Sequence, residues 1–87
     1  MEIKFCKSVI EKGLLPLKFS PLGQAGFPDR IILKPGGKTV FAEIKAPGKK
    51  PRLLQTKRIN LLAKFGFKTY VIDSLAAIED FIKNECS

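Results

Sequence analysis

Residues 28–45, PDRIILKPGGKTVFAEIK, contain the pattern that decides the fold. Two apolar segments, 30–33 and 39–45, flank a Lys-Pro-Gly-Gly-Lys sequence of the kind that forms a hairpin turn. Alternation along the second segment places Glu43 and Lys45 on one face of the strand and its aliphatic residues on the other. We therefore predict two antiparallel strands, with an acidic and a basic side chain emerging side by side near the end of the second.

The pattern on either side of this hairpin predicts the remaining elements. Apolar residues with helical spacing begin at residue 2, and Gly13 is placed to end that helix. The helix after the hairpin lies between the third and fourth strands of the predicted sheet. It is therefore a crossover connection, which implies a mixed sheet. The predicted elements are a helix over 2–12, an edge strand within 14–19, strands over 30–33 and 39–45, a helix ending near 65, a strand over 67–72 and a helix over 74–84 that Asp73 or Ser74 caps.

The predicted core includes one face of the helix that ends near residue 65. Leu54, Leu61, Leu62 and Phe65 share this face and are expected to be buried. Phe27 is expected to cover the core rather than to press on a ligand. Phe41 and Phe67 are candidates for a surface between two copies of the chain.

Length and charge limit the class of protein. The 87 residues are enough for one domain, 1–87. Sixteen Lys and Arg against eight Asp and Glu give a net charge of +8, which favours nucleic acid or an anionic membrane as the partner. No apolar run is long enough to span a bilayer, and the first residues lack the apolar core of a signal peptide. We therefore expect a cytoplasmic protein that binds DNA and does not enter a membrane.

The residue types that are missing or scarce narrow the chemistry. The sequence has no histidine, which excludes serine–histidine hydrolases and histidine-based acid–base catalysis. Cys6 and Cys86 are expected to be reduced thiols, and they are too few for a four-ligand zinc site. Any reaction must therefore use carboxylates, lysine, a metal ion and water.

Carboxylates with the spacing of a hairpin can provide such chemistry. Asp29 and Glu43 lie on facing strands and supply hard oxygen ligands, which suit Mg²⁺ or Mn²⁺. The Ile44 carbonyl would lie near the same ion, and Lys45 could orient a water molecule and offset charge on a phosphate. The alternative is a solvated cluster of salt bridges without a ligand.

Three motifs in order resemble a known family. Gly-Phe-Pro-Asp-Arg at 26–30, Glu-Ile-Lys-Ala-Pro-Gly-Lys at 43–49 and Gln55 resemble the VRR-NUC domain, a virus-type replication–repair branch of the PD-(D/E)xK nucleases. The resemblance runs from about residue 2 to residue 74. It implies an α/β (α+β) fold with a restriction-endonuclease-like core, in the order α-β-β-β-α-β-α, whose mixed central sheet is flanked by helices.

The same resemblance assigns roles to residues. It implies that Asp29 and Glu43 are metal ligands, that the Ile44 carbonyl is a further ligand, and that Lys45 is the catalytic lysine. Gln55 would contact metal-bound water or the phosphate.

The family also has a glutamate in its first helix that completes the acidic site. Glu2 fits this position best, with Glu11 as the alternative. Where the family often has a serine cap before the glutamine, residues 49–52 are Lys-Lys-Pro-Arg. The change weakens the predicted cap by around 1 kcal/mol and adds positive charge near the site.

The function that we expect is hydrolysis of DNA phosphodiester bonds by an Mg²⁺- or Mn²⁺-dependent endonuclease. The resemblance implies 5′-phosphate products and a homodimer similar to the Holliday-junction resolvases, with a branched or four-way DNA substrate. The alternative is a basic DNA-binding module whose acidic residues are structural. In either case phosphate contacts would come from basic residues near the site, and the candidates are Lys18, Arg30, Lys49, Lys50 and Arg52.

Overall fold

The predicted order of helices and strands is confirmed in the computed structural model, which describes residues 1–86. Observed boundaries differ from the predicted ones by only a few residues. The elements are α1 (Glu2–Glu11), β1 (Leu15–Lys18), β2 (Arg30–Lys34), β3 (Lys38–Ile44), α2 (Leu53–Lys64), β4 (Thr69–Ile72) and α3 (Leu75–Glu85).

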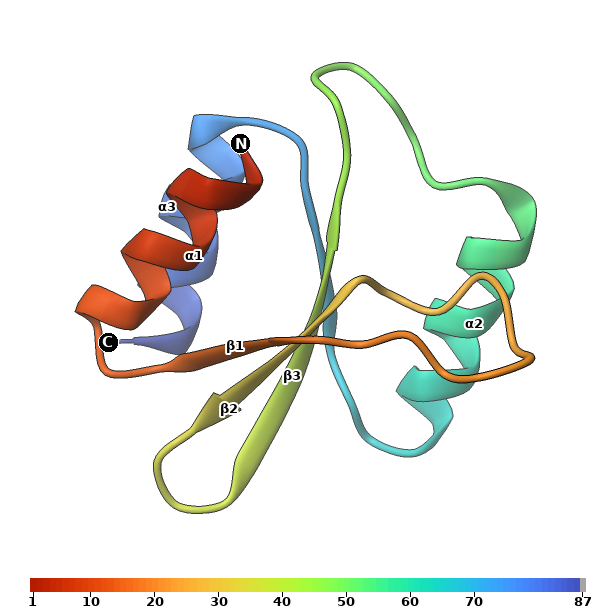
Figure 1. The fold of residues 1–87 in the computed structure, drawn as a ribbon, viewed down its shortest axis with the longest axis horizontal. Coiled ribbons are helices and arrows are strands. Elements are labelled where there is room, and N and C mark those ends of the chain that lie inside the picture. Colours follow the sequence, from red (N-terminus) through yellow and green to blue (C-terminus); the bar gives the residue numbers. More distant parts are fainter. Residues whose placement is uncertain (87) are drawn as a thin grey trace.

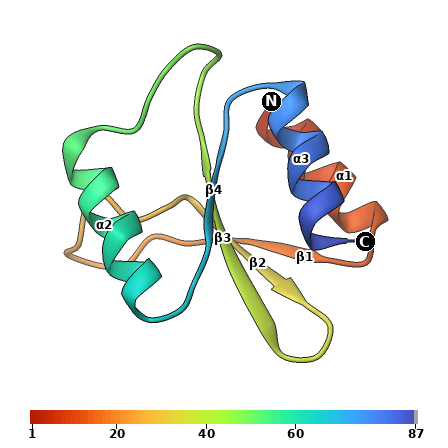
Figure 2. The same cartoon turned by 180° about the vertical axis from the view of Figure 1, so that it is seen from behind.

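The four strands form one mixed sheet in the order β1-β2-β3-β4. β1 and β2 are antiparallel, as are β2 and β3, whereas β3 and β4 are parallel because α2 returns the chain between them. Helices α1 and α3 lie together on one side of the sheet and α2 lies on the other (Figure 1). The view from behind shows the same three layers (Figure 2). The prediction of a mixed sheet flanked by helices, with β1 at its edge, is therefore confirmed.

The main core lies between the sheet and the α1–α3 pair. Phe81 of α3 is fully buried at its centre. Its ring makes edge-to-face contacts with Phe5, at a centroid distance of 5.1 Å, and with Tyr70, at 4.8 Å. Helix α1 buries Phe5 and Val9, whereas Ile10 on the same helix stays exposed. Aromatic packing of this kind adds to the burial energy of the rings.

The predicted core face of α2 is largely wrong. Leu62 is buried, but Leu54 and Leu61 are partly exposed and Phe65 is 72% exposed. The other buried residue of α2 is Gln55, two helical turns before Leu62. Only a narrow stripe of α2 therefore faces the protein, because this helix covers just part of its side of the sheet (Figure 1).

A second, smaller aromatic cluster lies on the α2 side. The Phe41 ring is in contact with Phe19, at a centroid distance of 5.4 Å, and with Phe67, at 5.5 Å. Phe27 packs on Phe19 and lies under the Arg58 guanidinium, as a covering core residue should. Because Phe41 is buried within the chain, it does not form a surface for a second copy, and that part of the prediction is wrong.

Polar side chains join the end of α3 to the sheet. Lys34 of β2 lies 2.7 Å from Glu85, and the Tyr70 hydroxyl donates a hydrogen bond to the same carboxylate. Burial acts to raise the pKa of Glu85, but the hydrogen bonds from Lys34 and Tyr70 outweigh it, so this pKa lies below its ordinary value. Burial, together with the bond to Glu85, raises the pKa of Tyr70 to about 12. Glu85 is therefore bound as the carboxylate.

Replacing this carboxylate should make stability less dependent on pH. A carboxyl group with a lowered folded-state pKa stabilises the protein above its unfolded-state pKa, and this contribution is lost as the pH falls through the folded-state value. We expect Glu85→Gln to reduce the free energy of unfolding by about 1–3 kcal/mol at pH 7. The difference from the wild type should shrink below about pH 4. Urea unfolding at both pH values measures it, with the exposed Glu79→Gln as control. Equal losses at both pH values would contradict the assignment.

Two local predictions, the cap of α3 and the glycine that follows α1, are also confirmed. Ser74 caps α3, with its side-chain oxygen accepting a hydrogen bond from the Ala77 N–H. Gly13 follows α1 with φ +84°, a conformation that favours glycine. Cys6 and Cys86 are unbridged. Within residues 1–86, the helices are too short or too polar to cross a membrane.

Candidate active site

Hydrogen bonds link the segments that carry Asp29 and Glu43, just before β2 and near the end of β3. The Asp29 N–H donates a hydrogen bond of 3.1 Å to Oε1 of Glu43, and the Ile44 N–H donates one of 3.2 Å to Oδ2 of Asp29. The Phe19 N–H also donates to the Asp29 carbonyl at 2.8 Å, which extends the pairing of β1 and β2 up to the acidic residue. Backbone contacts on both sides therefore fix the direction of the Asp29 side chain.

Two further side chains hold the other oxygen of Glu43. Lys45 Nζ lies 3.2 Å from Oε2, as the alternation of β3 predicted. Gln55, the third residue of α2, donates a hydrogen bond of 2.6 Å to the same oxygen through its side-chain amide. The amide oxygen of Gln55 accepts a bond of 2.9 Å from the Arg52 N–H at the start of the helix. Gln55 therefore links the beginning of α2 to the buried carboxylate and replaces part of the missing serine cap.

Burial and charge act against ionisation of Glu43. This residue is only 2% exposed. Burial raises its pKa above the ordinary value, and the negative charge of Asp29 adds to the effect, while the contact with Lys45 acts in the opposite direction. A divalent cation between the two carboxylates would relieve their repulsion. The electrostatics of the site therefore fit a bound cation.

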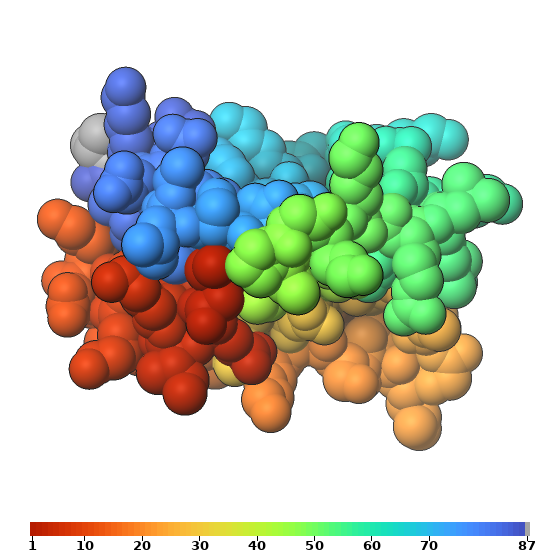
Figure 3. Space-filling model, turned by 90° about the horizontal axis from the view of Figure 1, so that it is seen from above, coloured from red at the N-terminus to blue at the C-terminus, as the bar shows by residue number. Residues whose placement is uncertain are grey.

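A cavity of about 400 Å³ opens beside the carboxylates. It brings together the start of α1, the beginning of the β1–β2 loop and the end of β3. Seen from above, the red N-terminal segment lies against the yellow-green loop that follows β3 (Figure 3). The cavity is lined by Glu2, Lys18, Phe19, Ser20, Asp29 and Ile44.

The cavity distinguishes between the two candidate glutamates of α1. Glu2 lines it together with Asp29, whereas Glu11, at the other end of α1, lines a groove between α1 and α3. Both Nε and Nη2 of Arg30 donate to Oε2 of Glu2, at 3.3 and 3.0 Å. The structure therefore places Glu2, and not Glu11, in the cavity that Asp29 lines. It also places Arg30 on a carboxylate rather than free in solvent.

The other predicted basic residues are all exposed. Lys18 is exposed and lines the cavity. Lys49 and Lys50 are exposed in the loop between β3 and α2. Arg52 is exposed at the start of α2 and lines a small hollow next to Gln55.

One loop contact that the sequence analysis missed helps to place the motif before Asp29. A Cβ atom at Gly26 would lie 2.6 Å from Cγ of Leu54, so only glycine lets this loop approach α2 so closely. Arg58 reinforces the approach by donating a hydrogen bond of 3.1 Å to the Ala25 carbonyl. The glycine of the Gly-Phe-Pro-Asp motif was the available signal, but its partner on α2 was not predictable from spacing.

The protein offers only a few side-chain ligands for a metal ion at Asp29 and Glu43. Within residues 1–86, no group of three cysteine or acidic side chains converges in the manner of a closed metal site. Two carboxylates nevertheless fit Mg²⁺, which usually keeps several waters and takes one or two carboxylates from the protein. Asp29 and Glu43 supply these two carboxylates, and the repulsion between them favours a cation at this position.

Comparison with known proteins agrees with the arrangement of these residues. A VRR_NUC domain of solved structure superimposes with a TM-score of 0.84 at 28% identity, covering 95% of this chain and 91% of the other. "Putative nuclease p44" of Acyrthosiphon pisum secondary endosymbiont phage 1 is 40% identical over 62 residues, which are 71% of this chain and 67% of the phage protein. The chain belongs to the VRR-NUC family. No family model matches the sequence.

The superposition of this chain on a VRR_NUC domain confirms the predicted fold. This family resemblance was carried by three short motifs, and the structure brings the key residues of all three together. Asp29, Glu43, Lys45 and Gln55 form one hydrogen-bonded cluster.

Proposed function

We propose that this VRR-NUC protein is a nuclease that hydrolyses phosphodiester bonds in DNA with the aid of Mg²⁺ or Mn²⁺. The observation that carries the proposal is the Asp29–Glu43 pair: the Asp29 N–H binds the Glu43 carboxylate, Lys45 lies 3.2 Å from that carboxylate, and Asp29 lines a cavity. Family membership and the phage relative, which carries the name nuclease, support it. The whole chain is proposed to act as one nuclease domain in the cytoplasm of a bacterial or phage-infected cell.

The residues of the cluster divide the work between binding and positioning. Asp29 and Glu43 would hold the metal ion, with the Ile44 carbonyl and Glu2 as further ligands. A divalent ion held there would stabilise negative charge on a phosphate oxygen and lower the pKa of a water molecule that attacks the phosphate. Lys45, which lies 3.2 Å from Glu43, would turn its ammonium group toward the scissile phosphate. There it would offset the negative charge that develops during attack.

We propose a different role for Gln55 from the one that the resemblance implied. Both ends of its amide already bind protein groups, Glu43 on one side and the Arg52 N–H on the other. We propose that Gln55 fixes the orientation of the Glu43 carboxylate. Supporting hydrogen bonds of this kind typically change metal affinity or activity by about 10–100-fold when they are removed.

The proposed substrate is branched DNA, cut by a homodimer. Lys18 lines the cavity, Lys49 and Lys50 are exposed in the loop that follows β3, and Arg52 lies next to Gln55. These basic residues would contact phosphates without reading sequence. A two-fold dimer carries two sites, which paired cutting of a four-way junction requires. We infer an endonuclease similar to the Holliday-junction resolvases.

Cleavage of end-labelled DNA tests this proposal. A four-way junction, a flap and a linear duplex of matched length are incubated with Mg²⁺ or Mn²⁺, and with EDTA as control. The proposal predicts metal-dependent, paired cuts that leave 5′-phosphates in the junction. Binding to all three substrates without any cut would favour the alternative, a DNA-binding module with structural acids.

Removing the Arg30 guanidinium should weaken metal binding through Glu2. Arg30 holds a carboxylate at the first residue of α1, close to a chain end that is otherwise prone to fray. We expect Arg30→Ala to lower the affinity for Mn²⁺ by about tenfold. Calorimetric titration in the absence of DNA measures this, and Arg52→Ala removes the same charge from an exposed position as the control. An unchanged or higher affinity in Arg30→Ala would show that Arg30 does not position Glu2 for the metal ion.

A further inference from the structure

We infer that the groove between α1 and α3 binds an amphipathic helix of a partner protein, which has an apolar stripe and acidic side chains along one edge of that stripe. Within residues 1–86, the groove shares no lining residue with the cavity beside Asp29, so this binding is independent of the proposed nuclease function. Three features carry the inference: the length of the groove, the apolar side chains of α3 and the unpaired lysines of α1.

The groove is long enough to receive a short helix. α1 and α3 run side by side in the same direction (Figures 1 and 2), and the groove between them has a volume of about 400 Å³. Its lining extends from Lys4 to Lys12 along α1 and from Leu75 to Lys83 along α3. Eight residues of a helix rise about 12 Å, which is the length of roughly two turns of a third helix.

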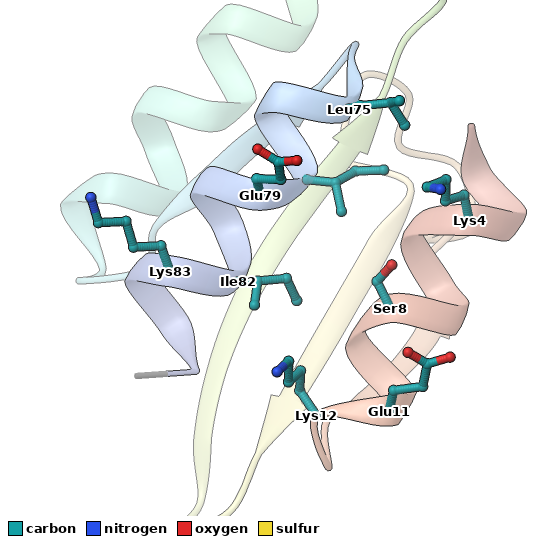
Figure 4. Close-up of a pocket in the computed structure, with 9 residues that line it drawn as sticks. Lys4, Ser8, Glu11, Lys12, Leu75, Glu79, Ile82 and Lys83 are labelled. Atoms are coloured by element: carbon teal, nitrogen blue, oxygen red, sulfur yellow. The ribbon is translucent and has the colours of Figure 1, made fainter.

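The wall that α3 contributes to the groove is apolar. Leu75, Ile78 and Ile82 are spaced three and four residues apart, so they share one face of the helix. Leu75 and Ile82 point across the groove toward α1 (Figure 4). Leu75 is 54% exposed and Ile82 is partly buried, while the almost fully buried Ile78 forms the floor between them. The apolar stripe of an amphipathic helix packs against a row of this spacing.

The opposite wall is basic. Lys4, Ser8 and Lys12 follow one another at intervals of four residues along α1 and its C-terminal end, and all three line the groove. The two lysine side chains extend toward α3 (Figure 4). Both are exposed, and within residues 1–86 neither takes part in an ion pair. Two uncompensated cations beside an apolar row match acidic side chains on the ligand.

The other charged residues of the groove do not neutralise this basic wall. Glu11 points away from α3, and Lys83 points away from α1 (Figure 4). Glu79 lies on α3, beside the apolar row and not beside the lysines. The ligand that fits therefore has its acidic residues on the α1 side of its stripe and neutral or basic residues on the α3 side.

An apolar wall facing a basic wall favours a protein helix over other ligands. DNA has phosphates for Lys4 and Lys12, but its charged backbone does not cover an apolar side chain such as Leu75. A bilayer surface is flat, whereas these residues line a concave site. A second copy does not fit either, because α2, the helix with exposed leucines, has three basic residues and no acidic one.

Three designed peptides of about 18 residues, long enough to form a helix in solution, test the inference. The first has leucines spaced three and four residues apart and glutamates beside that stripe. The second has lysine in place of each glutamate, and the third has glutamine in place of each leucine. Binding to the full chain is followed by NMR of methyl-labelled protein at about 0.15 M salt, which screens weak contacts with the rest of this basic surface.

We expect the glutamate peptide to bind at least about tenfold more tightly than either of the other two, because only it matches both walls. The methyl resonances that shift should be those of Leu75, Ile78 and Ile82. A glutamate peptide that does not bind, or that binds no better than one of the others, would overturn the inference. Shifts centred on Leu54 and Leu61 of α2 would overturn it as well.

Charge reversal on the protein separates this groove from general attraction to a basic chain. The Lys4→Glu/Lys12→Glu variant changes two exposed side chains. It should raise the dissociation constant of the glutamate peptide at least about tenfold and should bind the lysine peptide more tightly than the wild type does. Lys57→Glu/Lys64→Glu makes the same change at exposed positions of α2 and should leave both constants within about twofold. Equal effects of the two variants would overturn the inference.

Vesicles of phosphatidylserine and phosphatidylcholine test the membrane as the alternative ligand. We expect the two double variants to bind these vesicles equally, because they have the same net charge. If only Lys4→Glu/Lys12→Glu loses vesicle binding and the wild type does not bind the glutamate peptide, the groove recognises a lipid surface and the inference is wrong.

Discussion

Replacing Lys45 with methionine should lower the rate of DNA cleavage by about 10²–10³-fold. The ammonium group lies 3.2 Å from the carboxylate proposed to hold the metal, where it can also reach a phosphate. Methionine keeps the length of the side chain and removes its charge. Because Lys45 is half-buried beside Glu43 and not in the exposed basic loop, DNA affinity should change by no more than about twofold.

Single-turnover cleavage with saturating enzyme separates these two effects. Lys7→Met makes the same chemical change at an exposed position of α1 and serves as the matched control. If the Lys45→Met variant cleaves DNA as fast as the Lys7→Met variant, Lys45 does not take part in the reaction. A parallel loss of DNA binding would indicate that Lys45 acts only as a phosphate contact.

Replacing Phe81 with alanine should destabilise the protein by roughly 3–5 kcal/mol. The ring is fully buried and makes edge contacts with both Phe5 and Tyr70, so its removal leaves a cavity at the junction of α1, α3 and the sheet. A domain of this size has a total stability near the lower end of the usual range of roughly 5–15 kcal/mol. The variant should therefore be partly unfolded at 37 °C.

Urea unfolding followed by circular dichroism measures this loss. Phe65→Ala is the matched control, since this ring is 72% exposed at the end of α2. We expect a change of less than about 0.5 kcal/mol for the control. Similar losses in the two variants would mean that α2 buries the face predicted from its sequence, contrary to the structure.

Local sequence patterns predicted the helices and strands of the fold, but they did not predict which residues of each helix pack against other elements. The alternation in residues 39–45 and the turn before it defined the hairpin, and its strands occur with nearly the predicted bounds. Helical spacing in α2 correctly predicted a helix and misplaced most of its core. Periodicity shows which residues share a face, but it does not show how much of that face another layer covers. Phe65 is exposed for this reason.

The site was predictable to a similar degree. The spacing of Asp29, Glu43 and Lys45 indicated that their side chains would meet, and their hydrogen bonds agree. The burial of Gln55 against Glu43 was not predictable, because it depends on where α2 packs. The pairing of Arg30 with Glu2 joins residues 28 positions apart and has no signal in the local sequence. Its charge and its place beside Asp29 in the sequence suggested that Arg30 was available for DNA.

The most direct test of the account is the dependence of cleavage on Mn²⁺ concentration in the wild type and in Asp29→Asn. Asparagine keeps the shape of the side chain and an oxygen for the Ile44 N–H, but it loses the negative charge that binds the metal. The account predicts that the wild type cuts DNA only when Mn²⁺ is present. The Asp29→Asn variant should fold and bind DNA but should not cut it at any Mn²⁺ concentration at which the wild type is active. Cleavage that persists in EDTA, or that Asp29→Asn retains at the wild-type rate, would contradict it.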